Sequence, residues 1–339
     1  VLSLTNVREA IFNAIPMALK KGVSAGIGLF IAFIGLQGAN LVVNDDSTLL
    51  TYVKFVGDFH TIGIGALLAL IGLFIIVVLH HKNIKGSILI GILATWILGM
   101  ICEAIGLYVP DGKDFYSLYP TFRMIDFGAF GTTFGQCFNV DFSGVDILNF
   151  IAVLFAFLFV DIFDTLGTLI GVSTKANMLD EEGKLPRIRP ALLADAIATS
   201  VGAIFGTSTT TTYVESSAGV AAGGRTGLSA MVTGLLFLLA IVFAPIFTAI
   251  PSFATAPALI FVGFLMISSI ISIDFEDITE AVPAYLAMLA MPLMYSISEG
   301  IALGVISYVV INLCCGKAKK IKPLMYILTV LFVLKYIFL

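Results

Sequence analysis

Charged residues are scarce in this sequence. Asp, Glu, Lys and Arg make up 12% of its 339 residues, which is about half their share in a typical globular domain. Apolar residues make up 59% of the chain, and the mean hydropathy is +1.07. Because such a chain needs an apolar solvent around most of its length, we expect a lipid bilayer to surround it rather than water.

The sequence also lacks the patterns of many other functional classes. Its 18 basic and 22 acidic residues give a net charge of −4, which provides no basic surface for nucleic acid. The 4 cysteines form no C-x-x-C pair and the 3 histidines are too few for a metal site, so we expect no metal and no cofactor. The absence of G-x-S-x-G, H-E-x-x-H and P-loop motifs disfavours the commonest hydrolases and nucleotide-binding proteins.

Long apolar runs are abundant instead. A helix of about 20 apolar residues crosses a bilayer. The runs predict about ten spans, at residues 23–40, 62–79, 87–107, 147–172, 191–205, 228–250, 254–271, 278–295, 301–313 and 324–339. Glu299 is expected to cap the helix that begins near Gly300, because acidic residues are favoured at helix N-termini.

Basic residues concentrate in alternate connections between these spans. Loops rich in lysine and arginine face the cytoplasm, so the base-poor connections at residues 44–46 and 110–146 should face outward. The basic set comprises Lys20, Lys21, Lys82, Lys85, Lys175, Lys184, Arg187, Arg189, Arg225, Lys317, Lys319, Lys320 and Lys322. The alternation holds only if residues 206–224 also cross the membrane, and it predicts a multi-pass protein of the cell membrane.

Residues 206–224 are too polar for an ordinary span. The hydroxyl residues from Thr207 to Thr212 favour extended backbone, and a short helix is expected from Tyr213 to Ala222. Non-helical backbone at membrane depth must be buried in protein or line a cavity, and in transporters such breaks mark the substrate site. The alternative is a polar loop outside the membrane.

A short internal repeat also favours a transporter. Ala-Ile-Pro occurs at residues 14–16 and 249–251, and in both copies a glycine follows the proline twelve residues later, at Gly28 and Gly263. The two runs are predicted to cross in opposite directions. Inverted repeats of this kind are typical of secondary transporters.

Four carboxylates lie in predicted membrane segments. Asp161 and Asp164 are neighbours on one helix surface, where Thr168 opens space beside them; Asp195 lies in the next span and Glu215 in the broken segment. Because a charge in a span usually faces a cavity or a partner, we predict that Asp164 and Glu215 bind the N–H edge of a flat heterocycle. Asp161 and Asp195 are candidates for support or proton coupling, with local pairing of Asp161 and orientation of the threonine segment by Asp195 as alternatives.

With these residues the sequence resembles the AzgA-like purine permeases, the guanine/hypoxanthine/adenine branch of the nucleobase:cation symporter superfamily. The matching motifs are at residues 160–171, 191–196, 206–216, 223–227 and 254–259. The resemblance implies an all-α polytopic membrane protein with fourteen spans in two inverted repeats. A core domain and a gate domain would hold substrate at short extended segments of broken spans.

The resemblance also implies roles for individual residues. Asp164 matches the acidic substrate ligand of the eighth span and Glu215 that of the tenth. Thr212 and Tyr213 match the junction whose backbone would contact the base. Asp195 matches an acidic position in the ninth span that supports the site and the coupling.

The chain starts at Val1, which matches the family's connection into the fifth span, so the first four spans are expected to be missing. The expected divisions are 1–108 (spans five to seven, largely gate), 109–146 (outer loop), 147–227 (core spans eight to ten with the substrate site), 228–313 (span eleven in the core and spans twelve to fourteen in the gate) and 314–339 (a basic segment and an extra apolar helix). The gate domain is expected to form a homodimer.

The function predicted from these observations is import of purine nucleobases by proton symport, with the proton as the coupling ion. Two alternatives stay open: an anion transporter of the same fold, and a membrane-embedded aspartyl-type enzyme that uses Asp161 or Asp164. An anion site should offer cations, whereas this segment offers acids. The enzyme would need a second catalytic aspartate alongside the first.

Overall fold

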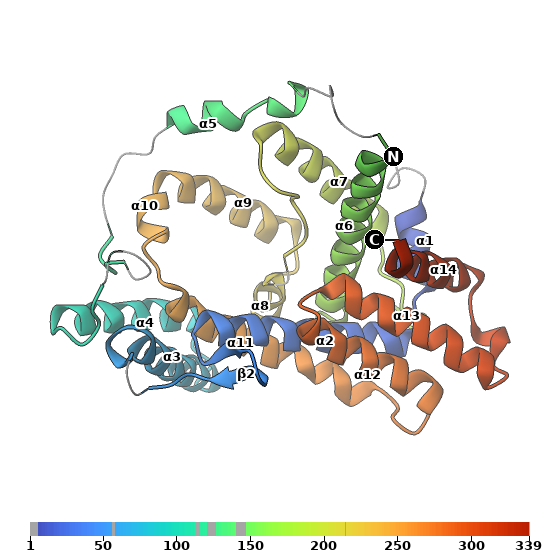
Figure 1. The fold of residues 1–339 in the computed structure, drawn as a ribbon, viewed down its shortest axis with the longest axis horizontal. Coiled ribbons are helices and arrows are strands. Elements are labelled where there is room, and N and C mark those ends of the chain that lie inside the picture. Colours follow the sequence, from blue (N-terminus) through green and yellow to red (C-terminus); the bar gives the residue numbers. More distant parts are fainter. Residues whose placement is uncertain are drawn as a thin grey trace. The chain divides into compact units, whose positions relative to one another are not determined.

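The structure is a computed structural model that describes residues 6–55, 58–110, 112, 116–120, 127–139, 147–213 and 215–338. Helices dominate it (Figure 1). The α-helices are α1 (Val7–Ala14), α2 (Met17–Gly38), α3 (Ile64–His81), α4 (Ser87–Ala104), α5 (Phe127–Thr133), α6 (Ile147–Lys175), α7 (Ile188–Phe205), α8 (Ser216–Ala221), α9 (Gly227–Val242), α10 (Ala244–Phe247), α11 (Ser252–Ile267), α12 (Ile278–Leu293), α13 (Ile297–Cys314) and α14 (Pro323–Phe338). Shorter π- or 3-10-helical pieces are η1 (Phe59–Gly63), η2 (Gln136–Phe138), η3 (Ser268–Ser272) and η4 (Ala318–Lys320).

Six helical stretches in the described part of the chain are long and apolar enough to cross a membrane: Met17–Gly38, Phe59–His81, Ser87–Ala104, Ile188–Phe205, Ser252–Ser272 and Ile297–Cys314. Three shorter apolar helices lie at Gly227–Val242, Ile278–Leu293 and Pro323–Ile337. On α9 large apolar side chains such as Leu236 and Phe237 are exposed, as lipid contact requires. The predicted helical membrane protein is confirmed at this level.

Most predicted spans coincide with a helix, and the differences have local causes. Helix α2 begins at Met17, whereas the predicted span begins at residue 23. The helix can include Lys20 because the Lys20 ammonium group has a partner inside the protein: its Nζ donates to the Gly183 carbonyl at 2.5 Å. The run predicted at 228–250 divides into α9 and α10, whose first turn contains Pro245. Ser296 rather than Glu299 caps α13, since its Oγ accepts the Glu299 backbone N–H at 3.3 Å, so the predicted cap was wrong.

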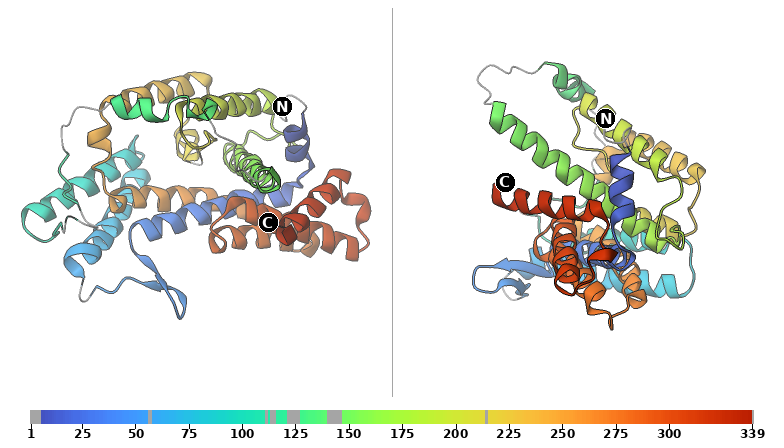
Figure 2. Two further views of the ribbon diagram at one scale, coloured as in Figure 1. Left: turned by 45° about the horizontal axis from the view of Figure 1, so that its top comes forward. Right: turned by 90° about the vertical axis from the view of Figure 1, so that its right-hand side faces the viewer.

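A β-hairpin was not predicted. Strands β1 (Val42–Asp45) and β2 (Leu49–Tyr52) pair antiparallel, and the hairpin extends as a narrow blue ribbon in Figure 2. Hydrogen bonds from the hydroxyls and backbone N–H groups of Ser47 and Thr48 close the turn on the Asp45 carboxylate. These bonds hold the pKa of Asp45 well below its usual range.

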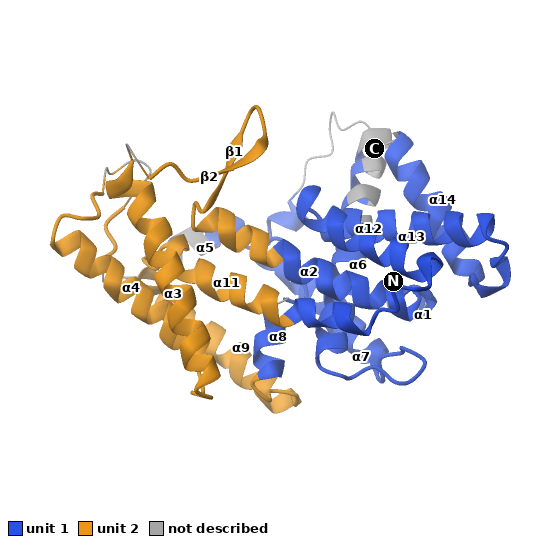
Figure 3. Ribbon diagram, turned by 90° about the horizontal axis from the view of Figure 1, so that it is seen from below, with its two compact units in different colours: residues 1–30, 126–221, 266–339 blue, residues 31–125, 222–265 orange. Residues whose placement is uncertain are grey.

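The chain forms two compact units, which Figure 3 colours separately. Unit 1 comprises residues 1–30, 126–221 and 266–339; unit 2 comprises residues 31–125 and 222–265. In unit 2, Trp96 and Phe253 belong to a core between α3, α4 and α11. In unit 1, Phe163 and Phe332 are buried with a ring separation of 4.7 Å, which packs α14 against α6. The predicted division into core and gate domains stays a prediction.

Close helix packing in unit 1 depends on glycine. A Cβ on Gly22 of α2 would lie 2.6 Å from the carbonyl oxygen of Ala284 in α12. A Cβ on Gly304 of α13 would lie 2.8 Å from the Cβ of Ala287. Small residues therefore let α2 and α13 approach α12 closely, as is common between membrane helices.

A cluster of polar residues fixes the start of α12 against the segment after α13. Asp277 caps α12, accepts from the Thr279 hydroxyl at 2.7 Å and pairs with Lys317 Nζ at 3.0 Å. Hydrogen bonds from Thr279 and Lys317 hold the pKa of Asp277 well below its usual range. The connection between the two ends is therefore strongest while this carboxylate is charged.

Candidate functional site

The centre of the candidate site is a break in helical structure between α7 and α8. Gly206, with a φ of +77°, ends α7 in a conformation that favours glycine. Residues 207–213 form neither helix nor strand, and Figure 1 shows this yellow segment leading from α7 to α8. The predicted break is present, and the helix after it is shorter than the predicted range from Tyr213 to Ala222.

Side chains anchor this threonine segment, defined as residues 207–213, to its neighbouring helices. The Thr209 hydroxyl donates to Oδ1 of Asp161 on α6 at 2.5 Å. The Thr199 hydroxyl of α7 donates to the Thr210 carbonyl at 2.8 Å. The Thr199 hydroxyl thus satisfies a backbone carbonyl that a strand partner would otherwise satisfy, and Asp161 anchors a side-chain hydroxyl of the same segment.

A buried ion pair is linked to the same segment through Thr165. Arg8 Nη2 of α1 lies 3.0 Å from Oδ2 of Asp195 on α7, and the two side chains are only 5% and 4% exposed. The hydroxyl of Thr165 on α6 lies 3.4 Å from Asp195 Oδ2 and 2.9 Å from the hydroxyl of Thr211. This arrangement fits the interpretation that Asp195 orients the threonine segment.

Arg8 was not among the residues predicted for the site, and no contact with Asp195 was predicted for Thr165 or Thr211. Arg8 and Asp195 are 187 positions apart, so nothing in the local pattern relates them. The available signal was a single arginine close to the first apolar run, because a base in such a position usually needs an acidic partner.

Asp164 differs from the other two aspartates. Its Oδ1 is buried, and no described residue forms a hydrogen bond with it. The backbone N–H of Ser298, in the first turn of α13, faces the same carboxylate. Thr168, one turn further along α6, is buried with 3% exposure. Asp164 therefore retains acceptor capacity in a buried position.

The structure does not join Glu215 to Asp164. Glu215 is exposed just before α8, and its carboxylate makes no hydrogen bond or ion pair with another described residue. Thr212 is half-buried and Tyr213 is 59% exposed. Helix α8 does pack against α6, which places the two acids on adjacent elements.

The chemistry available at this site is that of hydrogen bonding. Carboxylates accept, hydroxyls both donate and accept, and the free backbone of the threonine segment can do either. Among the described residues no cluster of three or more His, Cys, Asp or Glu could hold a metal ion. The described groups of the site can therefore form hydrogen bonds with a polar ligand.

Apolar helices of membrane-spanning length, combined with a broken segment that carries acids and hydroxyls, define a polytopic membrane transporter. The chain matches the Permease family, the xanthine/uracil permeases, over residues 1–303 and belongs to that family. It is therefore a transporter rather than an enzyme, and a multi-pass protein of the cell membrane.

Several relatives are named by the nucleobase they carry. The chain is 46% identical to the guanine/hypoxanthine permease PbuG of Bacillus subtilis, in an alignment that covers 100% of the chain and 72% of PbuG. It is 45% identical to PbuO of the same organism, another guanine/hypoxanthine permease, over 98% of the chain and 73% of PbuO. It is 39% identical to the adenine permease AdeP of Escherichia coli, over 100% of the chain and 71% of AdeP. The relationship predicted from the motifs is confirmed.

Proposed function

We propose that this protein imports purine nucleobases (guanine, hypoxanthine or adenine) by proton symport. The names of the relatives support the substrate class. The observation that carries the proposal is the buried Oδ1 of Asp164, which accepts no hydrogen bond from a described residue. A native protein seldom leaves a buried polar atom unsatisfied.

A purine base has the chemistry to satisfy this atom. Its flat edge carries N–H donors, and an ionised carboxylate offers only acceptors. Leaving a buried acceptor unpaired costs about 1–3 kcal/mol, and more when it is charged. An N–H group of the base would remove that penalty at Asp164, beside the buried Thr168.

Glu215 supplies the second contact in this proposal. It follows the threonine segment, which side-chain hydrogen bonds hold to α6 and α7. Because Glu215 is exposed, we assign the substrate a bridging role: the base binds Asp164 first, and Glu215, Thr212 and Tyr213 then approach it. This order provides a substrate-dependent step for alternating access.

Uptake of radiolabelled hypoxanthine into cells that express the protein tests the site. Asp164→Asn and Glu215→Gln are expected to lower uptake at least tenfold, because each removes a charged acceptor. Glu181→Gln is the matched control, since Glu181 is an exposed acid of the α6–α7 loop. Unchanged uptake in both site variants would refute the residue assignment, and competition by sulfate rather than purines would indicate an anion transporter.

Proton coupling needs a separate measurement. In our proposal one of the carboxylates of the site takes up the coupling proton. Asp161 and Asp195 keep the threonine segment in position. Uptake should rise as the external pH falls and should collapse with a protonophore. Uptake that instead requires external sodium would contradict the assigned coupling ion.

A further inference from the structure

Two of the described ion pairs lie largely inside the protein. One is the Arg8–Asp195 pair. The other joins Lys335 of α14 to Glu299 of α13, and its side chains are 14% and 21% exposed. The Tyr336 hydroxyl donates to Oε2 of the same glutamate at 2.5 Å. Helix α14 therefore places an ammonium group and a phenol on one carboxylate.

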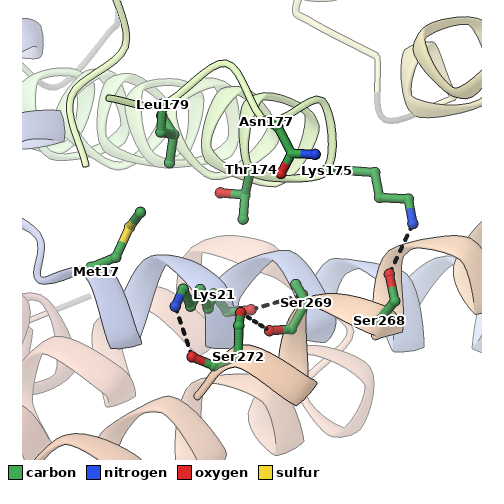
Figure 4. Close-up of a pocket in the computed structure, with 9 residues that line it drawn as sticks. All are labelled: Met17, Lys21, Thr174, Lys175, Asn177, Leu179, Ser268, Ser269 and Ser272. Atoms are coloured by element: carbon green, nitrogen blue, oxygen red, sulfur yellow. Dashed lines mark hydrogen bonds between the residues drawn. The ribbon is translucent and has the colours of Figure 1, made fainter. Parts of the chain in front are cut away.

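Other lysines of unit 1 are bound differently. At the cavity in Figure 4, Lys175 Nζ donates to the Ser268 hydroxyl at 2.8 Å, and Lys21 Nζ donates to the Ser272 carbonyl at 2.7 Å. These two ammonium groups are directed to separate serines, and no acidic side chain is among the described residues that line the cavity. Lys335 instead has an acidic partner, as a charge within an apolar helix requires.

The partner of Lys335 lies in the part of α13 that contacts the candidate site. Glu299 belongs to the first turn of α13, next to the fully buried Ser298, whose backbone N–H faces the Asp164 carboxylate. A Cβ on Gly167, three residues after Asp164 on α6, would lie 2.7 Å from Cγ2 of Ile297. The first turn of α13 therefore packs directly on the turn of α6 that carries Asp164.

Helix α14 contacts the same stretch of α6. Phe332 lies one turn before Lys335 and packs on Phe163, the residue before Asp164, with ring centroids 4.7 Å apart. Because residues three apart share a helix face, one face of α14 contacts both α6 and α13. The charges of Lys335 and Glu299 both act on the Asp164 carboxylate.

We propose that α14 positions the nucleobase site: Lys335 and Tyr336 hold Glu299, and this fixes the first turn of α13 against α6. This role rests on the proposed use of Asp164 as a substrate ligand. A buried ion pair is seldom more stabilising than well-packed apolar side chains, so stability alone does not account for a lysine and a glutamate between apolar helices. The pair instead keeps the Ser298 N–H at the Asp164 carboxylate, whose Oδ1 has no hydrogen-bond partner among the described residues.

Binding of radiolabelled hypoxanthine to the whole protein, purified in detergent, tests this role. Lys335→Met removes the charge and keeps an apolar side chain, and it should raise the Kd about tenfold because Glu299 is left unpaired beside Asp164. Lys335→Arg keeps the charge and should bind hypoxanthine more tightly than Lys335→Met. Lys319→Met, at an exposed lysine of η4, is the matched control and should leave the Kd unchanged.

A double variant separates positioning from general stabilisation. If Lys335 acts through Asp164, Lys335→Met should weaken binding by less than about twofold in a protein that already carries Asp164→Asn. An equal loss in both backgrounds would overturn the proposal. Tyr336→Phe removes only a hydroxyl and serves where Lys335→Met does not fold. It should raise the Kd about threefold, and an unchanged Kd would then refute the proposal.

Hydrogen exchange distinguishes failure of this role from failure of the substrate assignment. Unchanged hypoxanthine binding in Asp164→Asn would refute the substrate assignment. Exchange needs no substrate: Lys335→Met should speed exchange of the amides of residues 297–301 about fivefold and leave those of α4, in unit 2, unchanged. Unchanged exchange at residues 297–301 would refute the role of α14, whatever the role of Asp164.

Discussion

Variants of the Arg8–Asp195 ion pair test how much this pair stabilises the protein around the threonine segment. At 3.0 Å, with both side chains almost fully buried, the pair attracts by about 5.5 kcal/mol at an effective dielectric constant of about 20. Part of this attraction is offset by desolvation, and removal of one partner from a buried pair costs about 3–5 kcal/mol. We therefore expect Arg8→Met and Asp195→Asn each to destabilise the protein by about that amount.

The double variant distinguishes a specific pair from two independent contributions. Arg8→Met combined with Asp195→Asn leaves no unpaired buried charge. The double variant should therefore lose less stability than the sum of the losses in the two single variants, by about 2 kcal/mol or more. The assay is the fraction of monodisperse protein that survives heating in detergent, since membrane proteins often unfold irreversibly. Arg225→Met, at an exposed arginine, is the control.

Strictly additive losses would refute the coupling. So would an Arg8→Met protein that is as stable as the control variant. Uptake provides an independent readout, because Asp195 reaches Thr211 through Thr165. If Arg8 positions the site in this way, Arg8→Lys should retain more uptake than Arg8→Met at equal amounts of folded protein.

Three further predictions concern other parts of the molecule. Gly304→Leu should destabilise unit 1 by about 1–3 kcal/mol through overpacking against Ala287, measured as loss of monodisperse protein on heating; normal recovery would contradict the close approach. The pKa of Asp277 is lower in the folded protein than in the unfolded chain. The ionised Asp277 therefore stabilises the folded protein fully above the unfolded-state pKa of about 3.9, and this stabilisation is lost as the pH falls toward the folded-state pKa. The stability difference between unaltered protein and Asp277→Asn should thus shrink below about pH 4, and a constant difference would contradict it. Thr209→Val should speed hydrogen exchange in the threonine segment about fivefold, from loss of about 1 kcal/mol in its bond to Asp161; unchanged exchange would show that this bond does not anchor the segment.

The location of the spans was predictable because lipid imposes a simple requirement. Each crossing needs about 20 apolar residues in a row, so counting apolar runs located the run at 87–107 close to the helix at Ser87–Ala104. Individual ends were less predictable, because they depend on contacts made in space. Lys20 could lie inside α2 only because the Gly183 carbonyl and the Phe12 ring receive its ammonium group.

Candidate acids were predictable because charges are rare in spans, but their partners were not. Asp161, Asp164 and Asp195 stand out in any apolar sequence. Nothing in the sequence indicates that Thr209 forms a hydrogen bond with Asp161 or that Arg8 forms an ion pair with Asp195. Such pairings arise only when distant helices pack together.

The three aspartates lie on α6 and α7, and their surroundings differ. Asp161 accepts a hydrogen bond from a hydroxyl of the threonine segment, and Asp195 forms an ion pair with a buried arginine. Asp164 lies one turn from Asp161 on the same helix, and its Oδ1 remains without a described partner. If all three acids were structural, the oxygen of Asp164 would carry a penalty of 1 kcal/mol or more without compensation, by the usual estimate of about 1–3 kcal/mol. In the proposed function, a ligand that donates an N–H to Asp164 would remove this penalty, whereas Asp161 and Asp195 anchor the threonine segment directly and through Thr165.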